Sequence, residues 1–447
     1  MKFGGTSLED GPAFDRVARI ISSCDGHPVV VASAMSGMTN ALLASLETAK
    51  TGEIRRALHS LEAHFERHLK VAANLPVNAK TRIRKLLMRS WHDINETLEL
   101  AASDRMPTLQ LADAVASHGE RLSANLLTNV LQAYGLPAVY VDARRCIVTA
   151  DEHAGARPLV KETLRRSRMQ LAPLIAAKQI PVIEGFVAAT KKGVPSTLGR
   201  GSSNYTATLV SAAVGSREVQ IWTDVSGVLT ANPTLVPSAR TIPLLSYAEA
   251  AELARVGIRV LHPLMIPPVR ERCIPVRILN SRSPEEKGTL ICAPQGLTSG
   301  SIKSLAHRTN LAKLELCCPP KVLANGFLAA VRKIFGRFET QFEIVGRSNG
   351  TISLACDAAA PLPLIAQELR QIGSVEITKD CAVVTCVGQG LRGNGRASES
   401  LKRLKEIEPM LGWHSMSEFS LTTTVNTAAV VKVIKRLHEG IFECDQI

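Results

Sequence analysis

The stretch Lys2-Phe3-Gly4-Gly5-Thr6-Ser7 places a lysine directly before two glycines and the start of a helix pattern. Glycines let backbone N–H groups approach an anion closely, and a helix N-terminus adds favourable partial charge. A lysine beside them can neutralise charge that develops on a transferring phosphoryl group. A Gly-Gly pair alone is more often a plain turn, so further signals are needed before this stretch is assigned to a phosphate site.

A second turn of the same kind is found at residues 33–40, Ser-Ala-Met-Ser-Gly-Met-Thr-Asn, between a strand pattern and a helix pattern. Further continuous apolar strand patterns alternate with amphipathic helix patterns along the first 292 residues, at 28–33, 137–142, 180–185, 218–224 and 275–280. This alternation predicts an α/β fold with a largely parallel sheet between helices. In such a sheet, two loops at strand carboxyl ends can converge on one ligand.

The strand signal disappears between residues 51 and 105, so we expect a helical lobe inserted into a catalytic domain that spans residues 1–292. Residues 293–300 are rich in Gly, Ser and Pro and read as a linker. Residues 301–447 follow a strand–helix–strand–strand pattern twice, which predicts two ferredoxin-like βαββαβ modules. At 447 residues, the chain is long enough for several domains.

Composition excludes several classes of protein. The net charge of +13 comes from scattered basic residues, and with aromatic residues at 4% few side chains could stack on bases, so we expect no nucleic-acid partner. No apolar run reaches the ~18 residues that a membrane span needs. The first seven residues lack the apolar core of a secretory signal, and the ten cysteines form no metal-binding CxxC pair. The sequence therefore predicts a cytoplasmic protein with reduced thiols, no membrane association and no protein-held metal.

Two more stretches combine charge with glycine or serine. Residues 117–123, Ser-His-Gly-Glu-Arg-Leu-Ser, lie in a long helix pattern, where Glu120 is explained equally well by a solvated helix face. Residues 196–205 place Arg200 in a Gly/Ser loop before an apolar helix. An arginine can grip a carboxylate through two hydrogen bonds, whereas Ser203 or Asn204 alone fits a helix N-cap.

Taken together, these motifs are far more specific than any one of them. The chain carries, in order, Lys-Phe-Gly-Gly-Thr-Ser, Ser-His-Gly-Glu, Thr-Leu-Gly-Arg-Gly, Ile-Trp-Thr-Asp-Val-Ser-Gly-Val and Val-Leu-His-Pro. From residue 1 to residue 442 it resembles the aspartate kinases. The resemblance implies an amino-acid-kinase fold followed by two ACT domains, the first at about 313–378 and the second at about 301–312 plus 379–447. It also implies ATP, with Mg²⁺ carried on the nucleotide, and L-aspartate as substrates, and 4-phospho-L-aspartate as product. That reaction is the first step towards lysine, threonine, methionine and isoleucine.

The resemblance also implies the roles of individual residues. On the nucleotide side, Lys2 stabilises the transition state and the glycine turn holds phosphates; the implied residues are Lys2, Phe3, Gly4, Gly5, Thr223, Asp224, Leu229, Thr234, Arg259 and Val260. On the aspartate side, Glu120 takes the ammonium group, Arg200 the α-carboxylate, and three hydroxyls orient the β-carboxylate; the implied residues are Ser33, Thr39, Glu120, Arg200, Ser203 and Asn204. The implied catalytic set is Lys2, Gly4, Gly5, Arg200 and Ser203.

Several positions depart from the family pattern around the implied site. Asn204 replaces a usual aspartate, Leu229 and Thr234 replace an aromatic residue and an arginine, and Arg259 replaces a lysine. These departures leave open a pseudokinase that senses amino acids without useful phosphoryl transfer. A third hypothesis is an amino-acid kinase with another acceptor, such as glutamate or N-acetylglutamate; the paired ACT-like tail and the Ser-His-Gly-Glu motif argue against it.

The regulatory region leads to two further expectations. In lysine-sensitive members of the family, the first ACT domain binds its effector near the segment that corresponds to residues 322–349; the residues of that segment leave lysine, threonine, another ligand or no effector open. Ferredoxin-like modules leave strand edges that pair with another copy, so we expect a homodimer or dimer of dimers. Within one chain, the strand at 301–307 is expected to pair into the second module.

Overall fold

The computed structural model describes residues 1–103, 106–258, 260–293, 301–317, 326–338, 340–348, 350–391 and 413–443. The chain forms two units. The first comprises Met1–Val228, Pro243–Tyr247 and His262–Ala293, and the second comprises Leu229–Ile242, Ala248–Leu261 and Pro294–Ile447. Residues 294–300 of the expected linker and the helix expected at 397–406 lie outside the described residues.

The first unit is built on an eight-stranded sheet in the order β3-β5-β2-β1-β8-β10-β11-β9. All neighbouring strands in it are parallel except β10 and β11. The strands are β1 (Lys2–Phe3), β2 (Val30–Ala32), β3 (Ala138–Val141), β5 (Ile180–Glu184), β8 (Val219–Thr223), β9 (Leu244–Ser246), β10 (Val276–Asn280) and β11 (Thr289–Cys292). A small second sheet joins β4 (Val148–Thr149), β6 (Val187–Thr190) and β7 (Pro195–Thr197). The predicted α/β class is therefore confirmed.

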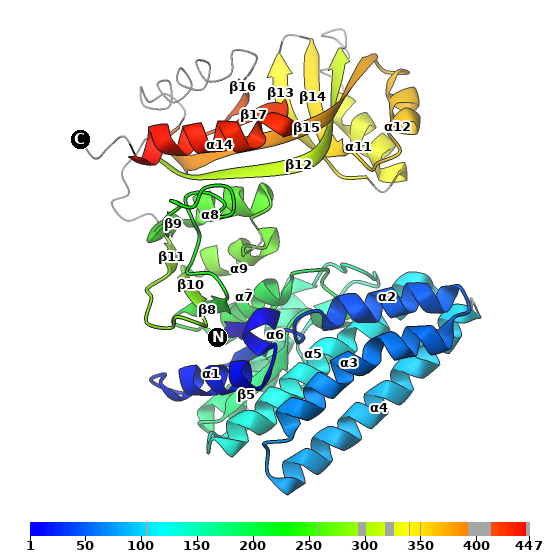
Figure 1. Ribbon diagram of the computed structural model, residues 1–447, viewed down its shortest axis with the longest axis vertical. Helices are drawn as coiled ribbons and strands as arrows, with labels where there is room; N and C mark the ends of the chain where they lie inside the picture. Colours follow the sequence, from blue (N-terminus) through cyan, green and yellow to red (C-terminus); the bar gives the residue numbers. More distant parts are fainter. Residues whose placement is uncertain are drawn as a thin grey trace. The chain divides into compact units, whose positions relative to one another are not determined.

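Helices of the first unit bury the apolar strands on both faces of the sheet, as expected for parallel strands. They are α1 (Gly11–Ser22), α2 (Met38–Lys50), α3 (Ile54–Ala72), α4 (Val77–Ala102), α5 (Thr108–Ala133), α6 (Val160–Ala176), α7 (Ser203–Val214) and α9 (Ile266–Arg270). Helix α5 packs on β2, β3 and β5, and α7 packs on β1, β2 and β8. Figure 1 shows α2, α3, α4 and α5 side by side, so the segment expected to form a helical lobe contributes α3 and α4 to a four-helix layer.

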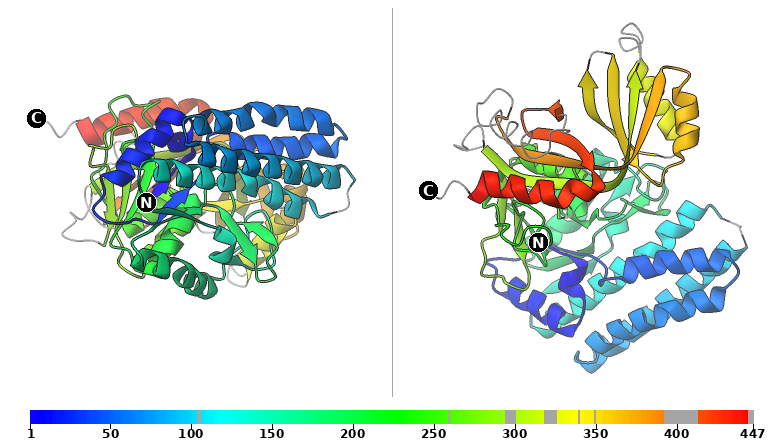
Figure 2. Two further views of the ribbon diagram at one scale, coloured as in Figure 1. Left: turned by 90° about the horizontal axis from the view of Figure 1, so that it is seen from below. Right: turned by 45° about the horizontal axis from the view of Figure 1, so that its top comes forward.

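The second unit is built on a six-stranded antiparallel sheet in the order β13-β14-β12-β15-β17-β16. Its strands are β12 (Ser301–Cys317), β13 (Phe342–Ser348), β14 (Thr351–Asp357), β15 (Ser374–Gln389), β16 (Trp413–Met416) and β17 (Ser420–Asn426). Its helices are α8 (Tyr247–Arg255), which begins in the first unit, α11 (Phe327–Arg337), α12 (Leu362–Leu369) and α14 (Val430–His438). Figure 2 shows α14, in red, lying along β12 and β15.

Strands β12 and β15 run through both predicted modules. Residues 301–308 of β12 pair with residues 383–389 of β15, beside β17, whereas residues 311–317 pair with β14 and with residues 374–381 of β15. The register shifts between Arg308 and Leu311, where Asn310 takes a left-handed conformation with φ of 59°. Residues 301–307 therefore pair into the second module, as expected from the sequence.

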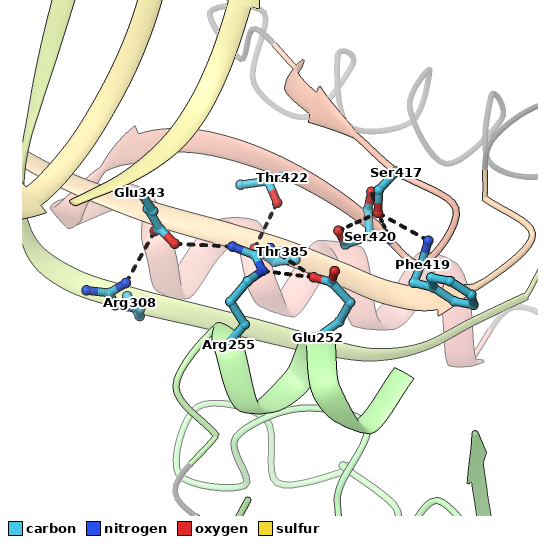
Figure 3. Close-up of polar contacts among 9 residues, drawn as sticks. All are labelled: Glu252, Arg255, Arg308, Glu343, Thr385, Ser417, Phe419, Ser420 and Thr422. Atoms are coloured by element: carbon cyan, nitrogen blue, oxygen red, sulfur yellow. Dashed lines mark hydrogen bonds and ion pairs between the residues drawn. The ribbon is translucent and has the colours of Figure 1, made fainter. Parts of the chain in front are cut away.

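Two segments that precede residue 292 in sequence belong to this second unit. Ala231 and Val236 lie in the same hydrophobic core as Leu421 of β17 and Val433 of α14. Figure 3 shows Arg255 of α8 between Glu252 and Glu343: it donates a hydrogen bond of 2.9 Å to Glu252 and one of 3.3 Å to Glu343. The predicted boundary near residue 292 does not capture this association, because apolar loop residues do not indicate which core they enter.

A buried histidine joins the first of these segments to α14. His438 is fully buried; its Nε2 lies 2.9 Å from Thr230 Oγ1 and its Nδ1 lies 2.9 Å from Glu443 Oε1. Thr230 Oγ1 also accepts a hydrogen bond from the backbone N–H of Arg240. The imidazole thus connects segments that are 208 residues apart in sequence.

We expect His438→Ala to destabilise the second unit by about 2–4 kcal/mol, because it leaves a cavity and an unsatisfied buried hydroxyl. Urea unfolding of the full chain measures the change. Lys432→Ala, at an exposed position of the same helix, is the matched control and should stay within about 0.5 kcal/mol of the wild type. Equal losses in the two variants would contradict a specific role for the histidine.

Candidate active site

The carboxyl ends of four adjacent strands bring several of the predicted site residues to one edge of the large sheet. Phe3 at the end of β1 is in register with Ala32 of β2 and with Trp222 of β8, and Ala32 is in register with Glu184 of β5. The strand ends and the loops after them carry the first glycine turn at Gly4 and Gly5 and the second at residues 33–40. They also carry Thr223 and Asp224, and the turn that begins at Gly185 after β5. Ligands of open α/β sheets bind at this edge.

Lys2 is the first residue of β1, one residue before this edge, and is only 9% exposed. Its Nζ comes within 3.5 Å of the position that a Cβ on Gly4 would occupy, so the ammonium group lies against the glycine turn. Burial lowers the pKa of Lys2 to about 8, and the nearby carboxylates of Glu120 and Asp224 oppose that shift. A buried cation beside a glycine turn is well placed to receive an anionic ligand.

The two glycine turns meet, as the sequence suggested. A Cβ on Gly5 would lie 2.9 Å from the carbonyl oxygen of Ala34, and Ser36 N–H donates to the Gly5 carbonyl at 3.2 Å. Gly4 N–H donates to the carbonyl of Trp222 at 3.0 Å. Gly37 starts α2 with a positive φ of 83°, a conformation that disfavours other residues. Glycine is therefore required here for close approach between loops.

Glu120 projects from α5 into this edge and is 4% exposed. Its Oε2 has no hydrogen-bond partner among the described residues, while the backbone N–H of Ala34 bonds to the carboxylate. Burial is the main cause that raises the pKa of Glu120 to about 8; the bond from Ala34 and the charge of Lys2 lower it. An incompletely satisfied buried carboxylate indicates a missing partner, and a cation is the partner that suits it.

The Arg200 loop is shaped by two glycines. Gly199 and Gly201 have φ of 86° and 76°, and Arg200 between them is exposed. Ser203 then begins α7 in a buried position, and a Cβ on Gly185 would lie only 2.5 Å from Ser203 Cβ. The serine is therefore held tightly against the turn that follows β5.

The remaining predicted residues fall into three groups. Asn204 is buried in the first turn of α7, while Ser33 and Thr39 are half-buried near the second glycine turn. The Phe3 side chain is fully buried and stacks on Trp222 at 6.0 Å, which leaves only its backbone for ligand contact. The residues predicted on the nucleotide side belong to different units. Thr223 and Asp224 lie in the first unit, and Leu229, Thr234 and Val260 lie in the second. Arg259 lies outside the described residues.

Sequence reasoning missed one charged group at this edge. Glu184 ends β5, is 1% exposed, and accepts hydrogen bonds from the Tyr140 hydroxyl and from the backbone N–H of Ala143. The available signal was an acidic residue that closes the apolar run at 180–183. An apolar strand pattern does not by itself indicate a role for a charged residue at its end.

Residues 1–280 match the amino acid kinase family. The chain is 31% identical to the "Lysine-sensitive aspartokinase 3" of Escherichia coli, over 99% of this chain and 98% of that protein. The crystal structure of E. coli aspartokinase III in complex with aspartate and ADP (R-state) superposes with a TM-score of 0.86 at 30% identity, covering 99% of both chains. The T-state structure of the same enzyme with lysine and aspartate gives a TM-score of 0.78, with 99% and 98% covered.

The family match covers more than half of the chain and the structural similarity extends over nearly all of it, so the protein belongs to the amino acid kinase family. More narrowly, it belongs with the aspartokinases and is therefore a kinase enzyme of amino acid biosynthesis. None of the described helices combines the length and apolar character needed to cross a lipid bilayer.

Gly185→Ala tests the close packing behind Ser203. The new methyl group must displace the start of α7, so we expect kcat/KM to fall by about 100-fold, since small misplacements of positioning groups cost this much. Gly11→Ala, where a Cβ meets nothing within 4 Å, is the control and should keep wild-type kinetics. Full activity in Gly185→Ala would show that catalysis does not require Ser203 to be held in this position.

Proposed function

We propose that this aspartokinase transfers the γ-phosphate of ATP to the β-carboxylate of L-aspartate and forms 4-phospho-L-aspartate. The observation that carries the proposal is the pair of buried, incompletely compensated ionisable groups at one sheet edge, the Lys2 amine and the Glu120 carboxyl. They suit a phosphate on one side and an amino group on the other. ADP release with Mg·ATP, measured with and without aspartate, tests it directly.

On the phosphate side, Lys2 neutralises charge on the transferring group, while the turn at Gly4 and Gly5, which carries no bulky side chains, lets phosphate oxygens approach the backbone closely. Thr223, the last residue of β8, and Asp224 after it would face the nucleotide. Mg²⁺ usually reaches such sites on the nucleotide phosphates with few protein ligands. Asp224 is exposed and carries a carboxylate at the same edge, so it fits as a direct or water-bridged ligand.

On the aspartate side, Glu120 binds the ammonium group and Arg200 the α-carboxylate, as a planar guanidinium does well. Hydroxyls of Ser33, Thr39 and Ser203 orient the β-carboxylate. That carboxylate is already ionised at neutral pH, so no general base is needed. Catalysis then rests on positioning and on charge neutralisation.

The finer assignments in the second unit are also proposals. Leu229, Thr234, Arg259 and Val260 are proposed to contact the nucleotide. The two modules, bounded as the sequence predicts, are proposed ACT domains that bind an amino-acid effector and assemble a homodimer or dimer of dimers. The E. coli aspartokinase III structure with lysine and aspartate supports an effector of this class. A thermal-shift screen of the amino acids would identify the ligand.

The two alternative functions are a pseudokinase and a kinase that acts on another acceptor. Full-length similarity to aspartokinases does not favour a pseudokinase, and it offers no support for glutamate or N-acetylglutamate as acceptor. Aspartate-dependent ADP release well above the ATP-only rate would exclude the pseudokinase. A higher rate with glutamate than with aspartate would overturn the proposed substrate.

Lys2→Met removes the charge but keeps most of the aliphatic volume. Because the ammonium group stabilises the transition state, we expect kcat to fall by about 10³-fold or more, as for loss of a key electrostatic donor. Steady-state kinetics with saturating substrates measures it. Lys161→Ala, at an exposed position of α6, is the control. Unchanged turnover in Lys2→Met would exclude Lys2 from the mechanism.

Asn204→Asp tests the aspartate side. A carboxylate in the first turn of α7 is favoured by the helix dipole and adds a charge-assisted bond to the substrate ammonium, worth about 1.5–3 kcal/mol. The aspartate KM should therefore fall about 10- to 100-fold, with little change in the ATP KM. An unchanged aspartate KM would show that residue 204 serves only the helix start.

A further inference from the structure

The strongest unassigned group in the first unit is the carboxylate of Glu184. It is 1% exposed, and both of its oxygens accept hydrogen bonds: Oε1 from the Tyr140 hydroxyl and Oε2 from Ala143 N–H, at 2.7 Å for the latter. A backbone N–H is only a donor, and a phenol beside a carboxylate donates as well. The two partners therefore suit the ionised form of this buried carboxyl group.

The fold places this charge beside the ammonium subsite. Glu184 is in register with Ala32, and Tyr140 with Val182, so Tyr140, Val182, Ala32 and Glu184 share the sheet face that α5 covers. Helix α5 carries Glu120, whose carboxylate bonds to the N–H of Ala34, two residues beyond Ala32. The two buried carboxylates thus enter the same corner from opposite sides, one from the sheet and one from the helix.

Their electrostatic coupling follows from this arrangement. Burial is the largest cause that raises the pKa of Glu120 to about 8; the charge of Glu184 adds to it, and that of Lys2 opposes it. Burial also raises the pKa of Glu184, against which its two donors act. The charged and titratable groups around the pair include Lys2 of β1, Tyr140 of β3, Asp142, Arg144 and Cys146 after β3, His118 and Arg121 of α5, and Asp224 after β8.

We propose that Glu184 is a positioning residue for aspartate binding, which keeps Glu120 protonated in the free enzyme and adds negative charge to the ammonium subsite. The Oε2 of Glu120, which has no partner among the described residues, is the atom that the substrate ammonium meets. When the ammonium group arrives, Glu120 releases one proton to solvent and the carboxylate forms the ion pair. Glu184 remains ionised throughout, so the subsite holds two negative charges around one ligand cation. This inference rests on the proposed role of Glu120.

The test is the pH profile of kcat/KM for aspartate at saturating ATP, from about pH 6 to about pH 9.5. In the wild type, kcat/KM should rise with pH as Glu120 loses its proton. In Glu184→Gln, the neighbouring charge is gone, so the rise should move to lower pH by roughly 0.5–1 unit. Above that rise, kcat/KM should be about 10-fold lower than in the wild type, because one attractive charge is missing. The defect should therefore be large at high pH and small at low pH.

Asp113→Asn is the matched control. Asp113 is also a buried carboxylate of α5, and it accepts hydrogen bonds from Thr197 and from the backbone N–H of Ala154. Its loss should leave the midpoint of the pH profile unchanged. Tyr140→Phe is a second test variant. It removes one hydrogen-bond donor to Glu184 and so destabilises the ionised form of that carboxylate. The pH profile should therefore shift to lower pH, by less than in Glu184→Gln.

A second readout does not depend on turnover. Calorimetry of aspartate binding in buffers of different ionisation enthalpy should show proton release at pH 7 in the wild type and less release in Glu184→Gln. An unshifted profile with a uniform loss of activity in both Glu184→Gln and Tyr140→Phe would overturn the proposal and show a purely structural role. Absence of aspartate-dependent turnover in the wild type would instead overturn the proposed function, and this inference with it.

Discussion

The candidate active site depends on Lys2, which is buried in a central strand of the largely parallel sheet. β1 has strands on both sides and Lys2 is only 9% exposed, and a buried unpaired cation costs several kcal/mol. Asp224, which follows β8, offsets part of that cost with its charge, and Glu120 of α5 does so when it is ionised. In the proposed function a phosphate completes the compensation, so the free enzyme would hold its cation ready for the ligand and need little rearrangement when it binds.

Local signals made much of this predictable. A glycine pair or an arginine between glycines is visible in sequence because backbone conformation and close approach demand those residues, and the turns at Gly5 and Gly199 are where they were expected. Glu184 could not be placed in the same way. Its importance comes from strand register, which brings it beside Ala32, and from the approach of α5, and neither leaves a mark within a few residues of position 184.

The composition of the second unit was hidden for a related reason. Ala231 and Val236 sit in an unremarkable loop pattern, and only the folded chain shows that they share a core with α14. Arg255 reaches Glu343, and Thr230 reaches His438, across long stretches of sequence. Because segments 229–242 and 248–261 pack with the predicted ACT modules, a ligand that reshapes those modules acts on these segments through direct contacts, without a long relay.

Strands β12 and β15 each belong to two modules at once. A module that shares its central strands with a neighbour has no separable boundary, so neither half can be cut out, replaced or lost by recombination without severing two strands. The regulatory region is therefore inherited as a single piece, and a hybrid enzyme with a new effector specificity would have to exchange both modules together.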